Sequence, residues 1–399
     1  MAAGWPTKVT YANGDVFSAS DINDTNGTLN YIDPTSATDG QVLTRDNASA
    51  GKVKWAASSV ATSLGFTAGK NRIINGDFSI NQRAFTSTTT SGAYGQDRFY
   101  NLNSNGTTTY SAQTFTPGTA PVTGYESTNF ARIVSTGQTL SSAFSVFGQK
   151  IEDVRTFANQ TVTFSFWAKA ASGTPSISAN FFQDFGGGGS SGVYSYPTTQ
   201  KQAITTSWAR YSFTTTIASM TGKTIGTGSF LAAWIWTSAG SDFNTQTGSL
   251  GIQSATIDIW GVQVEAGSTA TAFQTATGTI QGELALCQRY YYRTSSSASN
   301  PYAAFTQFAP ANSTTQAFIG MRLPVSMRIP PLVLEFANLQ LADGSNLYTV
   351  TSASLDNNTT SNDIAAAGYN VASGLTQYRP YVARGNNSAS AYIGFSAEL

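Results

Sequence analysis

Residues 162–169 alternate apolar and polar side chains with a period of two. The run reads VTFSFWAK, so that valine, both phenylalanines and alanine fall on one side, and threonine, serine, tryptophan and lysine fall on the other. An alternation of this kind is typical of a β-strand with one buried face. Similar runs occur at 208–213, 230–236 and 256–264, with no helical pattern between them. Short strands at this spacing predict a sandwich or jelly roll.

The composition supports a mainly β fold. Charged residues make up 11% of the chain, against about 25% in typical domains, and threonine, serine, asparagine and glycine take their place. Lysine and glutamate favour helices, whereas threonine, valine and the aromatic residues suit a pleated, half-buried surface. Because 12% of the residues are aromatic, most of the chain is expected to fold.

Charge and cysteine content exclude several kinds of partner and site. Lysine and arginine total 21, balanced by 21 aspartates and glutamates, so no basic footprint for nucleic acid is expected. No run of about 18 apolar residues predicts membrane insertion. Cys287 is the one cysteine in the sequence, and the first residues lack the pattern of a signal peptide. These features indicate a chain that is assembled in a reducing cytoplasm.

The sequence contains no histidine. This removes Ser-His-Asp and Cys-His catalysis and the histidine metal sites. Only carboxylates could run a reaction, and a glycosidase needs two of them at a defined separation. Asp184, Asp242 and Asp258 cannot be paired from sequence. We therefore expect a binding protein and not an enzyme.

Residues 1–70 differ in composition from the rest of the chain. They are short of large apolar side chains and rich in turn formers, with one small hairpin predicted from 40–46 and 52–55. Such a segment cannot bury a large core alone. It is expected to fold against its own copies or against another protein.

Two β-domains are predicted after this segment. Residues 71–278 carry the alternating strands and are expected to form the jelly roll. Residues 279–399 are expected to begin with a helical connector at 283–290 and to continue as a second β-sandwich. The three tyrosines at 290–292 are expected to form the packing seam between the two domains.

Several stretches resemble tail fibre and other receptor-binding proteins of tailed bacteriophages. They are YANGDVFSASDIN at 11–23, RIINGDFSINQR at 72–83, FSFWAKA at 164–170, WGVQVEAG at 260–267, ELALCQRYY at 283–291 and GFSAEL at 394–399. The central ones are similar to the carbohydrate-binding-module-like jelly roll of such fibres. Each stretch is weak alone, and the combination is specific.

The resemblance implies a homotrimeric fibre of the virion, assembled in the host cytoplasm. Residues 1–70 would attach to another virion protein, and the β-domains would adhere to a host-surface glycan or other receptor. Attachment at the tail is preferred over the head or collar. A decoration fibre with a purely structural role is the alternative, and a polysaccharide depolymerase is the weaker one. The C-terminal sandwich, residues 279–399, would form the tip, and for receptor contact this distal domain is preferred over the central one, with both left open.

Sugar recognition requires exposed aromatic rings with polar groups beside them. Trp167 and Lys169 lie on the polar side of their predicted strand and are the first candidates for glycan or receptor binding. Tyr194 and Tyr196, close to the glycine run at 186–189, are the second. The competing interpretation is that all of these aromatic residues pack in cores or between subunits.

A further pair of tryptophans lies in the run at 230–236. Trp234 and Trp236 share one face of that strand with Phe230, while Leu231 and Ile235 point the other way. One of these faces must belong to a core.

Asp77 is the candidate metal ligand. A jelly roll of this type often carries a structural calcium, which takes hard oxygen ligands. The competing interpretation is a turn aspartate that bonds its own backbone. No other cofactor is expected.

Overall fold

The computed structural model of the protein describes residues 41–45, 53–57 and 68–399. The chain divides into two units, Met1–Phe66 and Thr67–Leu399. In the first unit, β1 (Gln41–Arg45) pairs antiparallel with β2 (Val53–Ala57), and this confirms the predicted hairpin. The rest of the proposed attachment segment up to residue 67 lies outside the described residues.

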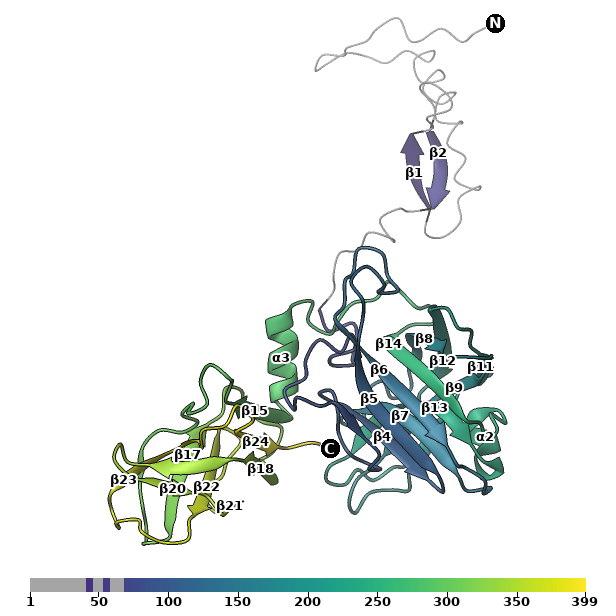
Figure 1. The fold of residues 1–399 in the computed structure, drawn as a ribbon. Helices are drawn as coiled ribbons and strands as arrows, with labels where there is room; N and C mark the ends of the chain where they lie inside the picture. Colours follow the sequence, from purple (N-terminus) through teal and green to yellow (C-terminus); the bar gives the residue numbers. More distant parts are fainter. Residues whose placement is uncertain (1–40, 46–52, 58–67) are drawn as a thin grey trace, which may run out of the picture. The chain divides into compact units, whose positions relative to one another are not determined.

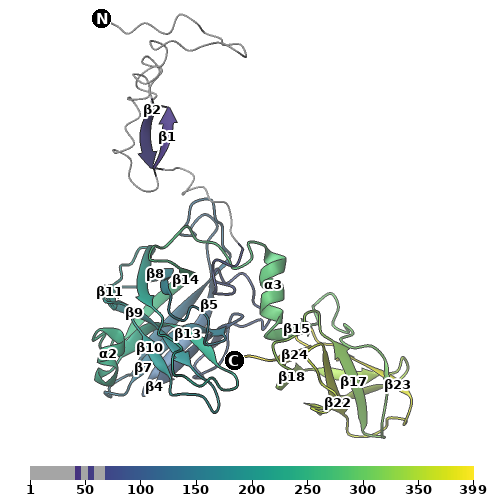
Figure 2. The ribbon, with the colours of Figure 1, turned by 180° about the vertical axis from the view of Figure 1, so that it is seen from behind.

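The larger unit contains two antiparallel sheets that form two layers (Figure 1). The first, here called the β13 sheet, has the order β10-β9-β13-β7-β4, with β11 paired to β9. Its strands are β4 (Phe99–Ser104), β7 (Phe144–Glu152), β9 (Ser176–Asp184), β10 (Val193–Ser195), β11 (Lys201–Ala203) and β13 (Phe230–Ala239). Figure 2 shows the layers from behind.

The second sheet, here called the β8 sheet, has the order β12-β8-β14-β6-β5-β3. Its strands are β3 (Ser87–Thr88), β5 (Thr107–Thr114), β6 (Asn129–Thr136), β8 (Thr161–Ala170), β12 (Ala209–Thr216) and β14 (Ala255–Ala266). Between β4 and β14 the chain passes repeatedly from one sheet to the other. This arrangement is a jelly-roll sandwich, so the predicted fold of the central region is confirmed.

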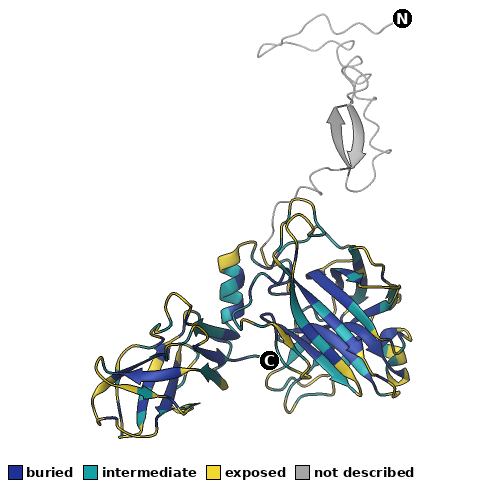
Figure 3. Cartoon of the chain, viewed as in Figure 1, coloured by how far each residue is buried: buried dark blue, intermediate teal, exposed yellow. Residues whose placement is uncertain are grey.

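The predicted alternation places one set of side chains between the sheets. Phe164 and Phe166 of β8 are buried there together with Leu231 and Ile235 of β13. Burial is highest along the strands and lowest in the loops (Figure 3). The core therefore consists of the inward-facing half of each strand, as a period of two requires.

A helix leads into the remaining strands. α3 (Ile280–Gln288) begins after Thr279, whose hydroxyl accepts a hydrogen bond from the Gly282 amide as an N-cap. The prediction of 283–290 missed the first turn because the capping threonine precedes the apolar run. No described helix is long and apolar enough to cross a membrane.

The strands after α3 form three small antiparallel sheets, with the orders β15-β24-β18, β16-β23-β19-β20 and β17-β22-β21. They are β15 (Tyr291–Ser295), β16 (Ala309–Pro310), β17 (Gln316–Arg322), β18 (Val333–Ala337), β19 (Leu339–Ala342), β20 (Leu347–Thr349), β21 (Ser352–Leu355), β22 (Ile364–Asn370), β23 (Pro380–Gly385) and β24 (Tyr392–Ser396). Tyr369, Tyr381 and Phe395 are fully buried among them. These strands have a sandwich-like core of their own.

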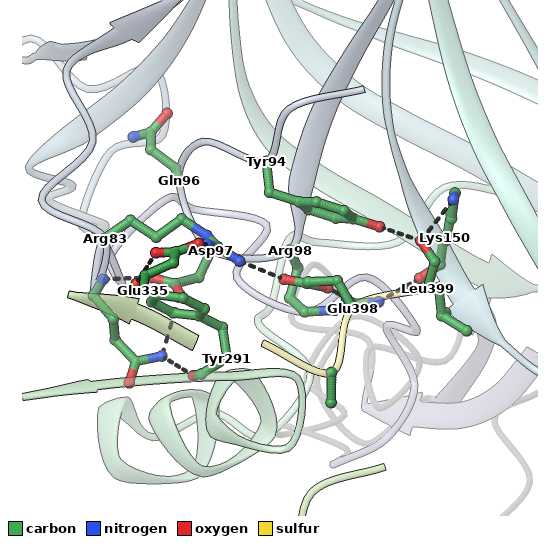
Figure 4. A network of polar contacts seen from close by, with 12 residues as sticks. Arg83, Tyr94, Gln96, Asp97, Arg98, Lys150, Tyr291, Glu335, Glu398 and Leu399 are labelled. Atoms are coloured by element: carbon green, nitrogen blue, oxygen red, sulfur yellow. Dashed lines mark hydrogen bonds and ion pairs between the residues drawn. The ribbon is translucent and has the colours of Figure 1, made fainter. Parts of the chain in front are cut away.

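The two β-regions meet in a network of polar and cation–π contacts (Figure 4). The Arg98 guanidinium lies 3.5 Å from the centre of the Tyr290 ring and pairs with the Glu398 carboxylate. Lys150 Nζ donates to the carbonyl oxygen of Leu399 at 2.6 Å. Because Arg98 and Glu398 are both buried, separating the regions would leave two charges without partners.

A second arginine repeats this arrangement. Arg83 lies 3.5 Å from the centre of the Tyr291 ring and 3.3 Å from the Glu335 carboxylate. The Tyr291 hydroxyl also donates to Glu335, at 2.9 Å. Tyr292 packs against the second core instead. The predicted tyrosine seam is therefore confirmed for Tyr290 and Tyr291.

Candidate functional site

The outer side of the β8 sheet gathers charged and aromatic side chains from four strands. The register places Arg210 of β12 beside Trp167 of β8, and Asp258 of β14 beside Lys169. Arg132 of β6 is the next neighbour of Asp258. We call this surface the charged face. Its members are Arg132, Trp167, Lys169, Trp208, Arg210 and Asp258.

Trp167 is partly exposed and its ring is held from several sides. The ring centroid lies 5.4 Å from that of Trp260 and 6.1 Å from that of Phe273, both in edge-on geometry. The Arg210 guanidinium lies 4.6 Å from the Trp167 ring centroid. Gly261 has a φ of 65° at a register shift of β14, where a side chain would collide with Trp167. The ring is therefore fixed before any ligand arrives.

Asp258 is the negative centre of the charged face. Its side chain is 1% exposed, and both oxygens accept from Arg132, at 2.7 Å from Nε and 3.0 Å from Nη2. This bidentate pair raises the pKa of Arg132 against the opposing effect of burial. Lys169 Nζ lies 3.7 Å from Asp258 Oδ2, which is beyond hydrogen-bonding distance.

Arg210 is a partly buried guanidinium with few partners. Its Nη2 donates to Ser165 Oγ at 2.9 Å, and its buried Nε has no acceptor among the described residues. Burial lowers the pKa of Arg210, and the charge of Glu265 opposes that shift. A guanidinium offers five donors, so most of its hydrogen-bonding capacity is unused by the fold.

The four residues predicted to bind a glycan do not form one site. Trp167 and Lys169 lie together on the charged face. Tyr194 lies on β10 at the edge of the other sheet, where its ring packs against Phe182 at 4.8 Å. Tyr196 follows that strand and is 39% exposed. A prediction from the residues alone could not place these two pairs in different sheets.

Tyr194 belongs to an aromatic cluster on the outer side of the β13 sheet, which we call the aromatic layer. Its members are Tyr94, Tyr100, Phe144, Phe182, Tyr194, Phe230, Trp234, Trp236 and Phe243. Trp234 is 9% exposed and stacks on Phe182 at 5.1 Å. Its indole nitrogen donates to the Tyr100 hydroxyl at 2.6 Å. The aromatic layer is thus largely closed by its own members.

Both faces of β13 are buried, although its sequence required only one of them to belong to a core. Leu231 and Ile235 lie between the sheets, and Trp234 and Trp236 lie in the aromatic layer. Segment 241–250 supplies η3 (Ser241–Phe243), α2 (Asn244–Thr247) and a buried Leu250 to that layer. The Trp236 indole nitrogen donates to Asn180 Oδ1 at 3.1 Å.

Asp77 is 6% exposed and its carboxylate is used within the fold. Oδ1 accepts from the Ser79 amide at 3.3 Å, and Oδ2 accepts from the Tyr125 hydroxyl at 2.9 Å. Across the described ranges, no three histidine, cysteine, aspartate or glutamate side chains are grouped so as to hold a metal ion. The bond from the Ser79 amide is that of the competing turn aspartate, and the role of Asp77 as a calcium ligand stays a prediction.

The sequence prediction missed Arg132, Trp208 and Arg210. The run at 208–213 reads WARYSF, so its alternation already puts Trp208 and Arg210 on the same side of a strand. The sequence does not show which residues of neighbouring strands lie opposite one another. Only the pairing of β12 with β8 and of β14 with β6 brings these residues beside Trp167 and Lys169.

No protein-family model and no curated protein matches the sequence. Among solved structures, a Stig cyclase from Fischerella sp. TAU is similar over 51% of this chain and 100% of its own, at 12% identity and a TM-score of 0.31. A family 11 carbohydrate-binding module from Clostridium thermocellum is similar over 47% of this chain and 99% of its own, at 10% identity and a TM-score of 0.28. The CBM22-1 xylan-binding domain from Paenibacillus barcinonensis is similar over 52% of this chain and 100% of its own, at 12% identity and a TM-score of 0.27. These likenesses are too low to assign a function, which must be argued from the charged face itself.

Proposed function

We propose that this protein is a receptor-binding fibre subunit of a tailed-bacteriophage virion and that its charged face binds a host-surface glycan without catalysis. The observation that carries the glycan-binding part is Trp167, a partly exposed ring fixed between Trp260 and Arg210. An aromatic face stacks on the apolar side of a sugar ring, and neighbouring donors bond its hydroxyls. Lys169 and Arg210 supply such donors on two sides of Trp167.

The virion part of the proposal is supported by the sequence resemblance. In this proposal three copies form a homotrimer, residues 1–70 attach to another virion protein, and the fibre is assembled in the host cytoplasm. Trimerisation would raise the effective concentration for the second and third contacts, so weak single sites give useful adhesion.

A head, collar or decoration fibre with a purely structural role is the competing proposal. Labelling residues near the start of the chain in intact particles separates the two. Label at the tail supports a receptor-binding fibre, and label at the capsid vertices or collar supports the structural role. Oligosaccharide release from host polysaccharide would contradict the non-catalytic part.

The glycan-binding proposal is tested with the full-length chain on an array of neutral and acidic bacterial polysaccharides. Trp167→Ala is expected to lose at least about tenfold in affinity, which corresponds to about 1.4 kcal/mol. Tyr196→Ala tests the second candidate, an exposed aromatic ring of the same jelly roll, and the proposal expects it to leave the affinity unchanged. Equal binding by both variants, or no binding of any glycan by the unchanged protein, contradicts the proposal.

A further inference from the structure

The charged face carries more positive than negative charge. Arg132, Lys169 and Arg210 share this surface with Asp258, whose two oxygens both accept from Arg132. The Glu265 carboxylate also acts on Arg210, but it is paired with a further cation, Lys70, at 3.1 Å. Burying a cation without a counter-charge costs free energy. An arrangement of this kind is stabilised by an anion that comes from outside.

Lys169 is the first group available to such an anion. Its side chain is 30% exposed, and its ammonium lies 5.2 Å from the centre of the Trp208 ring. No acceptor in the described part of the chain lies within hydrogen-bonding distance of Nζ, since Asp258 is 3.7 Å away. An ammonium has three donors, and all three remain for a ligand.

Arg210 is the second group. Its guanidinium carbon lies 4.6 Å from the centre of the Trp167 ring, and the group donates to Ser165 alone among the described residues. Guanidinium geometry matches a carboxylate, which can accept two parallel hydrogen bonds from it. Its contact with Trp167 and its bond to Ser165 hold this group in place, so little conformational entropy is lost on binding.

The spacing of the two cations suits a substituted sugar ring. Lys169 lies two residues from Trp167 on the same side of β8, about 7 Å along the strand. Arg210 is the direct neighbour of Trp167 across the sheet. A sugar ring stacked at Trp167 therefore has a cation on each of two sides, within reach of a carboxylate at its edge.

We infer that the glycan bound by the charged face is anionic, with carboxylates of the kind that uronic acids carry. This inference rests on the proposed glycan binding and names its ligand class. A neutral polysaccharide would use Trp167 and the hydroxyl-bonding groups but would leave the excess of cations uncompensated. Electrostatic complementarity of this kind selects partners and accelerates encounter.

The test compares polygalacturonate, a polyuronate, with dextran, a neutral polysaccharide, using the full-length chain. The unchanged protein is expected to prefer polygalacturonate, and its affinity is expected to fall as added salt screens the charges. Lys169→Gln and Arg210→Gln are each expected to weaken polygalacturonate binding by about tenfold or more. Lys201→Gln on the β13 sheet is the matched control, because that exposed lysine donates to the Ser249 carbonyl oxygen, and it is expected to change nothing.

Three outcomes overturn the inference. They are no binding of polygalacturonate by the unchanged protein, equal affinity for both probes, and unchanged affinity in both glutamine variants. Binding of a neutral glycan that is lost in Trp167→Ala would leave the proposed function standing while this inference falls. Circular dichroism verifies folding, and if Arg210→Gln unfolds, Lys169→Gln, whose side chain is 30% exposed, decides.

Discussion

The two outer faces of the jelly roll use tryptophan in opposite ways. In the aromatic layer, Trp234 is almost fully covered and its indole nitrogen bonds to Tyr100. On the charged face, Trp167 remains partly exposed, with Arg210 and Lys169 beside it. Aromatic content alone therefore does not identify a binding surface. What covers the ring decides whether it contributes to packing or to recognition.

The covering segments explain the contrast. Phe243 of η3 lies 5.3 Å from the Trp236 ring, and Leu250 is buried beside it. On the charged face, Trp260 is fully buried under Tyr125 and Phe273, whereas Trp167 is left at the margin of that cluster. Each face therefore has a closed aromatic part, and on the charged face the partly exposed Trp167 ring has the Arg210 guanidinium 4.6 Å from its centre.

The largest expected effect is a difference in unfolding free energy between Trp234→Ala and Trp167→Ala. Trp234→Ala removes a buried ring from the aromatic layer and is expected to cost about 3–5 kcal/mol of unfolding free energy. Trp167→Ala removes a partly exposed ring and is expected to cost about 1–2 kcal/mol. Urea unfolding of both variants measures the difference. Equal losses would contradict the distinction between the faces.

Two glycines offer a matched comparison. At Gly148 a methyl group would lie 2.2 Å from the Ala233 carbonyl oxygen and 2.9 Å from Trp234 Cδ1. Gly148→Ala is therefore expected to cost about 1–3 kcal/mol by overpacking without changing glycan affinity. Stability is followed by urea unfolding and affinity on the polysaccharide array.

Gly261→Ala is the counterpart on the charged face. Its methyl group would lie 2.7 Å from Trp167 Cε3, and the φ of 65° is costly for alanine. Displacement of the Trp167 ring is expected to weaken glycan binding about tenfold, in line with the loss of one oriented contact. If Gly148→Ala weakened binding more than Gly261→Ala, the binding surface would be the aromatic layer.

Asp258→Asn tests how the negative charge of the charged face affects binding. The change removes a buried carboxylate from its bidentate pair with Arg132 and is expected to cost about 1–3 kcal/mol of stability. The same change frees Arg132, so affinity for polygalacturonate is expected to rise while affinity for dextran stays constant. Titration of both polysaccharides against the variant is the measurement. A fall in polygalacturonate affinity at intact fold would contradict the charge argument.

The smallest expected effect is a pH dependence of stability that arises from Glu265, which lies on β14. Burial acts to raise the pKa of Glu265, but hydrogen bonds from the Thr271 amide and hydroxyl, Gln263 and Lys70 outweigh it and lower the pKa below its usual value. A carboxyl with a lowered folded pKa stabilises the protein above its unfolded pKa of about 4.3, and this stability is lost as pH falls through the folded value.

Glu265→Gln is therefore expected to lower the melting temperature most near neutral pH. The gap between variant and unchanged protein should shrink as the pH falls below about 4.3. Thermal melts across the acid range measure it, with Asp153→Asn, an exposed surface carboxylate, as the control. A gap that is constant with pH would mean that the carboxylate charge of Glu265 does not stabilise the fold.

Much of the fold was predictable because it depends on local alternation. The run at 162–169 forms the predicted strand, β8. Its alternation correctly predicted that Trp167 and Lys169 lie on the side opposite Phe164. The candidate site was predictable only in part. Trp167 and Tyr194 were first and second candidates for binding, and the sequence gives no measure of which sheet each short strand joins.

By itself, the sequence determined that the chain is mainly β, folds into sandwiches and has no histidine for catalysis. These properties follow from composition and from the period of two. The tertiary structure alone decided that Arg210 and Asp258 lie beside Trp167 and Lys169, and that Trp234 is closed off. The physical reason is that register and burial depend on pairing between strands far apart in the chain, which no local pattern encodes.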